Sequence, residues 1–281
     1  GDPKTVDVGY TWTTYAERLE AEGISWISYQ NMPDEWGDNM LGAFRKFRKA
    51  NIASGFPVSS GDEPNKPYNN TGQAVPYHAN NPTTDNANNP LYKGIANTLP
   101  GTTPERYLDA FKKDVLDGKL PQVSWINAPS IYCEHPGPSS PVQGAWFIQA
   151  ILDALTANPE VWSKTVLLVN FDENDGYFDH IPSPSAPSPD GKGGFAGKTT
   201  LSVADLQAEY FTHAKPDGSK SQPPADGRVY GPGPRVHMFV ISPWSRGGWV
   251  NSQNFDHTSV LQFLEARFGV KETNISPYRR A

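Results

Sequence analysis

The feature that most constrains the fold is a continuous apolar run that ends abruptly in carboxylates. Residues 165–171 read Thr-Val-Leu-Leu-Val-Asn-Phe, and Asp172 and Glu173 follow at once. An apolar run without alternation is typical of a central parallel strand, buried on both faces. We therefore expect a covered sheet, with Asp172 and Glu173 standing where one of its strands ends.

Helical and strand patterns alternate along much of the chain. Thr14 and Glu17 have the spacing of a capping box at a helix start, and a strand-like run follows at 24–29. Further helices are expected near 42–50, 103–117, 142–157 and 257–269. Further strands are expected near 122–127 and near 235–242, the second of them buried. This succession predicts an α/β fold, a sheet with helices on both faces, in which the Pro-, Gly- and Asn-rich stretches 52–99 and 176–228 form long irregular loops.

Composition narrows the possible functions. The net charge of −6 argues against nucleic-acid binding, which needs clustered Lys and Arg. The single cysteine, Cys133, excludes an internal disulfide and any multi-thiolate metal site.

No run of about 18 apolar residues is present to span a membrane. The first residues are not a signal peptide, so any export signal has been removed. With no repeat or linker, we expect one domain over residues 1–281.

The segment after the apolar run concentrates negative charge. It contains four carboxylates, those of Asp172, Glu173, Asp175 and Asp179. Ligands bind at the carboxyl ends of strands in open α/β sheets, and a divalent cation offsets the repulsion between neighbouring carboxylates. Gly176 permits a sharp turn there. A metal site and a solvated acidic turn both fit these residues, whereas an EF-hand is excluded because its later Gly and Glu are misplaced.

A second polar cluster, Glu134 and His135, lies just beyond the strand expected near residue 127. Two successive strand ends would bring His135 close to Asp172. A histidine beside an acidic metal centre can bind the metal, donate to a phosphate or protonate a leaving group. The alternative is a histidine packed in a proline-bound turn.

The last helix begins at a third polar cluster. Asp256 or Thr258 could cap this helix, and the backbone N–H groups at its start could instead receive an anion. His237 falls inside an expected strand, which predicts a core or supporting role. The aromatic residues Trp146, Tyr177, Phe178 and Trp244 are candidates for a quaternary-ammonium cage, although core packing is the favoured interpretation. The segment 197–199 is not a P-loop, and no G-x-S-x-G elbow is present.

The run Phe-Asp-Glu-Asn-Asp-Gly-Tyr-Phe-Asp-His-Ile-Pro from Phe171 resembles the signature of a bacterial phosphoesterase family. That family contains phosphocholine-specific phospholipases C and certain acid phosphatases. Other segments agree in the expected order over nearly the whole chain, namely those beginning at Thr11, Gly23, Glu134 and Asp256. The Glu-Asn-Asp-Gly variant is more similar to the phospholipase branch.

The resemblance implies an alkaline-phosphatase-like α/β fold and a divalent metal held by Asp172 and Glu173. It places His135 by the phosphate, as a donor or general acid. It leaves a wider set of supporting or substrate-contacting candidates: Glu134, Asp175, Asp179, His180, Asp256 and His257. All-oxygen ligation would suit calcium, magnesium or manganese, whereas His135 as a ligand would favour zinc or iron.

The implied activity is cleavage of choline phospholipids to phosphocholine and diacylglycerol, by a secreted or periplasmic bacterial enzyme in transient contact with a membrane surface. The family's Glu-Asn-Arg-Ser-Phe-Asp-like motif and its Thr or Ser nucleophile are not found in this chain. We therefore expect an incomplete domain of a longer enzyme, which needs the upstream segment as a partner and continues into β-rich domains. An acid phosphatase and a non-catalytic fragment or binding module are the alternatives.

Overall fold

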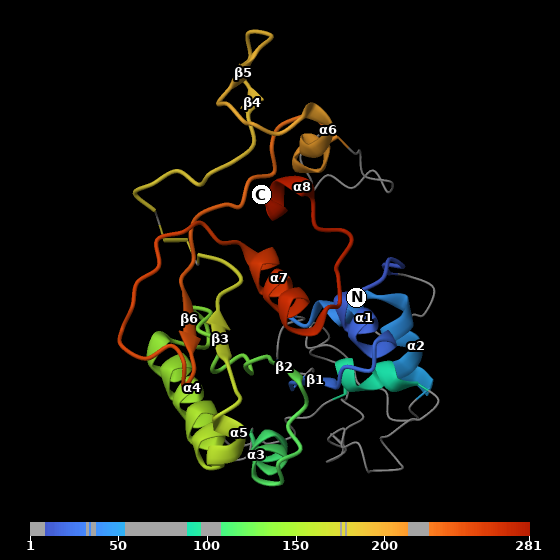
Figure 1. Cartoon of the computed structure of the whole chain (residues 1–281), viewed down its shortest axis with the longest axis vertical. Helices are drawn as coiled ribbons and strands as arrows, with labels where there is room; N and C mark the ends of the chain where they lie inside the picture. Colours follow the sequence, from blue (N-terminus) through green and yellow to red (C-terminus); the bar gives the residue numbers. More distant parts are fainter. Residues whose placement is uncertain are drawn as a thin grey trace. The chain divides into compact units, whose positions relative to one another are not determined.

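The structure is a computed structural model, and it describes residues 9–31, 34, 38–53, 89–96, 108–174, 176–177, 179–212 and 225–281. Most of the expected loop 52–99 and the expected helix start at 103–107 lie outside these residues. The chain separates into two compact units, one of Gly1–Val166 with Ser242–Arg246 and one of Leu167–Ile241 with Gly247–Ala281. Helices, small sheets and long loops make up both units, which is consistent with the predicted α/β class (Figure 1).

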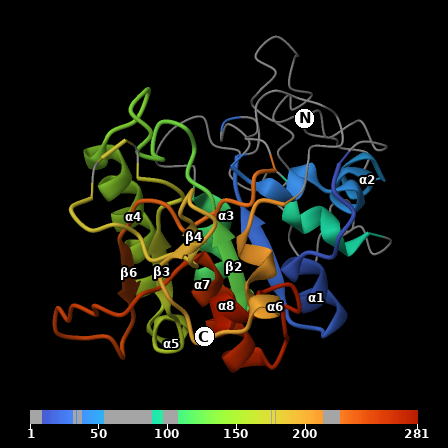
Figure 2. The same ribbon diagram turned by 90° about the horizontal axis from the view of Figure 1, so that it is seen from above.

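The first unit contains a parallel strand pair and most of the helices. Its elements are α1 (Tyr15–Ala21), β1 (Trp26–Tyr29), η2 (Met40–Ala43), α2 (Arg45–Ala53), η3 (Pro90–Gly94), α3 (Asp109–Leu116), β2 (Val123–Ile126), α4 (Pro141–Thr156) and α5 (Pro159–Trp162). The predicted capping box begins α1: Thr14 Oγ1 accepts from the Glu17 N–H at 3.2 Å, and the Thr14 N–H donates to Glu17 Oε2 at 2.8 Å. Strands β1 and β2 run side by side in parallel (Figure 2).

The core of this unit surrounds β1, whose four residues are all buried. Trp26 and Tyr29 of β1 pack edge-on against the rings of Phe47 and Phe111. The Tyr29 hydroxyl donates to Asp114 Oδ2 at 2.5 Å. Burial, and then the charge of Asp114, raise the pKa of Tyr29 far above its ordinary value, so Tyr29 stays a neutral donor.

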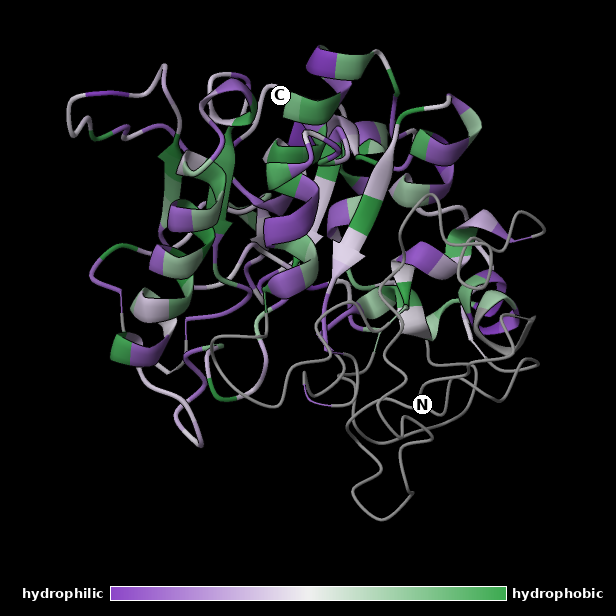
Figure 3. Cartoon of the chain, turned by 90° about the horizontal axis from the view of Figure 1, so that it is seen from below, coloured by the Kyte–Doolittle hydropathy of each residue, from purple (hydrophilic) through white to green (hydrophobic). Residues whose placement is uncertain are grey.

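The second unit contains β3 (Leu167–Asn170), β4 (Ser188–Pro189), β5 (Phe195–Ala196), α6 (Val203–Leu206), η5 (Gln207–Glu209), β6 (Met238–Ile241), α7 (His257–Phe268) and α8 (Pro277–Arg280). Strand β3 pairs with β6 from Leu167 opposite Ile241 to Asn170 opposite Met238, and the pair is antiparallel. Both strands are strongly apolar (Figure 3).

The structure corrects two expectations about these strands. The run at 165–171 does form a strand, but its partner within the described residues is antiparallel, and its residues are half-buried rather than central. Strand β6 was expected to be buried, yet Phe239 and Val240 are 49% and 48% exposed. An apolar run fixes the tendency to form a strand, whereas the direction and cover of that strand depend on distant segments. No helix in the described ranges is long and apolar enough to cross a membrane.

Candidate active site

Asp172 and Glu173 follow the end of β3 after one residue, Phe171, and both are exposed. They lead into a tight turn, in which the Tyr177 N–H donates to the Asn174 carbonyl at 3.1 Å and Asn174 Nδ2 donates to the Tyr177 carbonyl at 2.6 Å. Gly176 has φ +79°, a left-handed conformation that glycine adopts without strain, and this confirms the predicted turn. The strand end and the turn thus present two adjacent acids to solvent.

These two acids do not complete a metal site by themselves. Among the described residues, no group of three or more His, Cys, Asp or Glu side chains is arranged to hold a metal ion. Calcium takes about six to eight oxygen ligands and structural zinc about four ligands, more than two side chains supply. Asp175 lies outside the described residues. Metal binding by Asp172 and Glu173 therefore stays a prediction.

The carboxylate of Asp179 forms an ion pair with Arg235. Arg235 Nη2 donates to Asp179 Oδ1 at 2.8 Å, Arg235 Nε donates to Oδ2, and the Ile181 N–H donates to Oδ1 at 3.2 Å. The hydrogen bonds from Arg235 hold the pKa of Asp179 well below its usual range. His180 Nδ1 lies 3.3 Å from Asp179 Oδ1, with its ring exposed. Asp179 therefore fixes the chain after the acidic turn.

Glu134 has an unusual backbone conformation beside His135. Its φ of +70° lies in the left-handed region, which costs a residue with a β-carbon about 1–2 kcal/mol. The Glu134 N–H donates to Ser139 Oγ at 3.0 Å, and the Ser139 N–H donates to the His135 carbonyl at 3.0 Å. These bonds close the turn, in which Glu134 is half-buried and His135 is exposed.

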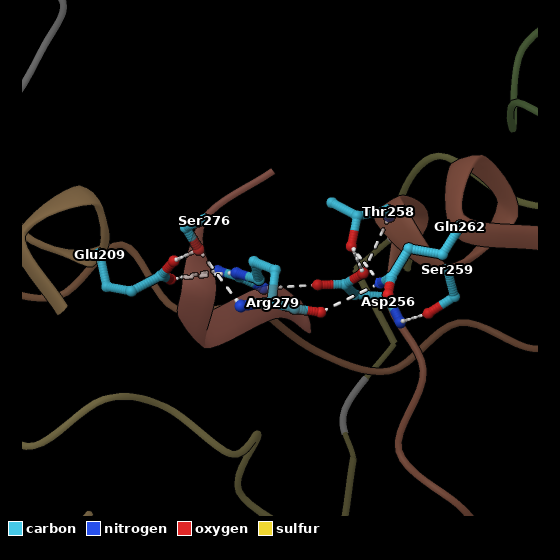
Figure 4. A network of polar contacts seen from close by, with 7 residues as sticks. All are labelled: Glu209, Asp256, Thr258, Ser259, Gln262, Ser276 and Arg279. Atoms are coloured by element: carbon cyan, nitrogen blue, oxygen red, sulfur yellow. Dashed lines mark hydrogen bonds and ion pairs between the residues drawn. The ribbon is translucent and has the colours of Figure 1, made fainter. Parts of the chain in front are cut away.

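Asp256 caps α7 and belongs to a polar network (Figure 4). Asp256 Oδ1 accepts from the Thr258 N–H at 2.8 Å, and Asp256 Oδ2 accepts from Arg279 Nη1 at 2.9 Å. Burial alone would raise the pKa of Asp256, but the hydrogen bonds from Thr258 and Arg279 outweigh it, so this pKa lies below its ordinary value. The same guanidinium reaches the buried Glu209 at 2.8 Å. The capping prediction is confirmed, and His257 lies exposed beside it.

Sequence reasoning missed Arg235, Arg279 and Glu209. Arg235 lies 56 residues from Asp179, and Arg279 lies 70 residues from Glu209. No local sequence motif indicates such pairs, because the number of residues between the partners matches neither a helix nor a hairpin. The structure therefore assigns Asp179 and Asp256 partners that the sequence did not reveal.

The exposure of one histidine and three aromatic side chains corrects further expectations. His237 was expected inside a strand, in a core or supporting role. It lies directly before β6 and is exposed, which contradicts the core role, while the supporting role stays a prediction. Its ring centroid lies 4.3 Å from that of Phe171 and 5.1 Å from that of Phe239. Core packing was favoured for three aromatic residues that are in fact exposed: Trp146 by 40%, Tyr177 by 76% and Trp244 by 66%. Phe178 lies outside the described residues.

The candidate residues fall in both units. His135 and Glu134 belong to the first unit, and Asp172, Glu173, Asp179, His180, Asp256 and His257 belong to the second. Their meeting in one site stays a prediction.

The sequence profile of the phosphoesterase family matches residues 1–271, so the chain belongs to this family. It is 51% identical over 277 residues to a non-hemolytic phospholipase C of Pseudomonas aeruginosa, which covers 98% of this chain and 32% of the relative. It is 40% identical over 297 residues to a non-hemolytic phospholipase C of Burkholderia pseudomallei, covering 98% of this chain and 35% of the relative.

A hemolytic phospholipase C of Pseudomonas aeruginosa is 38% identical over 287 residues, covering 100% of this chain and 32% of the relative. The chain therefore spans about a third of the length of these relatives. These comparisons confirm the family resemblance seen in the sequence.

Proposed function

We propose that the polypeptide containing this chain is a phospholipase C-type hydrolase that cleaves choline phospholipids into phosphocholine and diacylglycerol. The observation that carries the proposal is the 51% identity over 98% of the chain to a protein named a non-hemolytic phospholipase C. The exposed pair Asp172 and Glu173 at the end of β3 supports it, because phosphoester chemistry needs charged groups that a substrate can reach.

The proposed reaction adds water across one phosphodiester bond. The bond between phosphorus and the glycerol oxygen breaks, the glycerol oxygen gains a proton, and the phosphocholine product gains the hydroxyl oxygen. His135 is the proposed general acid for the glycerol oxygen, since its side chain is exposed and an imidazolium can donate a proton near neutral pH. We assign no nucleophile within this chain.

The proposal includes a divalent metal, of unspecified identity, with Asp172 and Glu173 as part of its ligand set. Water, the substrate phosphate or further side chains would supply the remaining ligands. It also includes an alkaline-phosphatase-like sheet, one domain that extends beyond these residues, and a secreted or periplasmic bacterial location. The resemblance in sequence supports each of these points.

Among the exposed aromatic residues that the structure describes, Tyr177 is the one that lies beside the acidic pair in sequence. Tyr177 lies in the turn that follows the acidic pair, and its side chain is 76% exposed. An aromatic face attracts a quaternary ammonium group by a cation–π interaction. Tyr177 is therefore the proposed contact for the choline headgroup.

The test compares p-nitrophenyl phosphocholine with p-nitrophenyl phosphate, using the full polypeptide with and without chelator. We expect preference for the diester, loss of activity on chelation, and loss of activity in Asp172→Asn. Glu160→Gln is the control, because Glu160 is an exposed carboxylate of α5 that pairs only with its neighbour Lys164 among the described residues. Preference for the monoester would indicate an acid phosphatase, and phosphocholine binding without turnover would indicate a binding module.

A further inference from the structure

The connection between β6 and α7 exposes large apolar side chains. Trp249 and Val250 are 87% and 90% exposed. Gly247 and Gly248 precede them with φ of +116° and +64°, and a β-carbon at Gly247 would lie 3.0 Å from the Trp249 indole nitrogen. The indole therefore lies over a glycine turn while most of its surface meets solvent. Figure 1 shows the connection as an open arc without helix or strand.

The same part of the sequence lacks negative charge. Residues 227–255, here called the acid-free segment, contain no Asp or Glu, although the chain has 30 acidic residues among 281, or about one in nine. The segment contains three arginines, of which Arg246 lies three residues before Trp249. An exposed apolar segment without carboxylates can approach a surface that carries phosphate groups without repulsion between like charges.

The chemistry of these side chains favours a lipid surface as the partner. Tryptophan is enriched where hydrocarbon meets water, because its ring is apolar and its N–H remains able to hydrogen-bond. Moving a valine side chain out of water lowers the free energy, and an arginine can extend its charged head to a phosphate. These side chains lie in a loop, so the contact would be made at the surface of the bilayer.

We propose that the acid-free segment is the surface by which the protein contacts phospholipid bilayers. Trp249 and Val250 enter the headgroup region, and Arg246 lies beside lipid phosphates. This inference rests on the proposed phospholipase function, because an enzyme that cleaves lipids must reach a substrate held in a bilayer. It assigns to the loop a role in binding the membrane, distinct from the chemical step.

The test uses the full polypeptide with Trp249→Ala and Val250→Asp. The matched control is Val203→Asp, since Val203 on α6 is also strongly exposed, at 74%, and lies two residues from Asp205. Binding is measured by sedimentation with phosphatidylcholine vesicles, turnover with the soluble ester p-nitrophenyl phosphocholine, and folding by thermal denaturation without lipid. We expect each loop variant to weaken vesicle binding roughly tenfold, with turnover of the soluble ester and the denaturation temperature unchanged.

Three results would overturn the inference. Vesicle binding equal to wild type would show that the loop does not contact lipid. A lower denaturation temperature in both loop variants would show that the loop packs against another part of the polypeptide. Loss of soluble-ester turnover at unchanged stability would place the loop in the active site. Vesicle binding that needs Trp249, in a protein that cleaves neither ester nor lipid, would support the inference while contradicting the proposed function.

Discussion

The carboxylate of Glu134 lies directly against Gly144 of α4. A β-carbon placed on Gly144 would fall 2.1 Å from Oε1 and 2.2 Å from Cγ of Glu134. Glu134 is also the residue with φ +70°, and His135 follows it. The helix backbone therefore supports the strained turn that carries the proposed general acid.

We predict that Gly144→Ala destabilises the protein by roughly 1–3 kcal/mol and lowers kcat, because the new methyl group displaces Glu134 and with it His135. The measurements are urea denaturation and turnover of a soluble ester. The double variant Glu134→Gly with Gly144→Ala removes both the clash and the backbone strain, so its stability should return toward wild type. A fully stable Gly144→Ala protein would show that the Glu134 side chain moves aside without cost.

Replacing Arg279 by Met leaves the charge of Glu209 buried without this guanidinium. We expect a loss of roughly 3 kcal/mol in the free energy of unfolding, because removing one partner of a buried ion pair leaves the charge of the other buried and uncompensated. The control is Arg228→Met, since Arg228 pairs with Asp226 in an exposed contact, where solvent screening leaves an ion pair little effect on stability. Equal effects of the two substitutions in urea denaturation would refute this ranking.

The ion pair between Arg280 and Glu265 predicts an acid-sensitive contribution to stability. Arg280 donates to both carboxylate oxygens of Glu265, at 2.8 and 2.9 Å, and these bonds lower the pKa of Glu265 from 4.5 to about 2. Because folding lowers the pKa of Glu265, the ion pair stabilises the fold at pH values above the pKa of this residue in the unfolded chain. This contribution is lost as pH falls from 4.5 toward 2.

The denaturation temperature of Arg280→Met should therefore lie below that of wild type at pH 6, and the gap should shrink between pH 4.5 and pH 2. Lys164→Met serves as the control, because Lys164 pairs with an exposed carboxylate on α5. A gap that stays constant down to pH 2 would rule out Glu265 as its source.

Asp172→Asn and Glu173→Gln should separate activity from stability. Both carboxylates are exposed, so each change should alter the free energy of unfolding by no more than about 0.5 kcal/mol. Turnover should fall by at least about 100-fold if these groups act on the reacting phosphate or its metal. A variant with full turnover would remove that residue from the proposed site.

Tyr177→Leu should weaken recognition of choline while leaving the chemical step intact. We expect KM for a phosphocholine ester to rise about threefold to tenfold, with kcat unchanged, because leucine has no π face. Tyr177→Phe keeps the ring and should behave like wild type. A similar rise in KM for a phosphoethanolamine ester would argue against a specific contact with the quaternary ammonium.

Features set by neighbours in sequence were predictable. Thr14 and Glu17 are three residues apart, and Asp256 lies beside the helix that it caps, so both caps can be seen in the residue pattern. Gly176 marked the turn for the same reason. Such interactions close within one helical turn or one bend, where residue type alone decides the conformation.

Tertiary structure decided what depends on distant residues. The apolar run of β3 predicted a strand but not its antiparallel pairing with β6, since the same residues suit either direction. Asp172, Glu173, Asp179 and Asp256 are equivalent carboxylates in the sequence. Only long-range packing distinguished them, by joining Asp179 to Arg235 and Asp256 to Arg279 and by leaving the other two exposed.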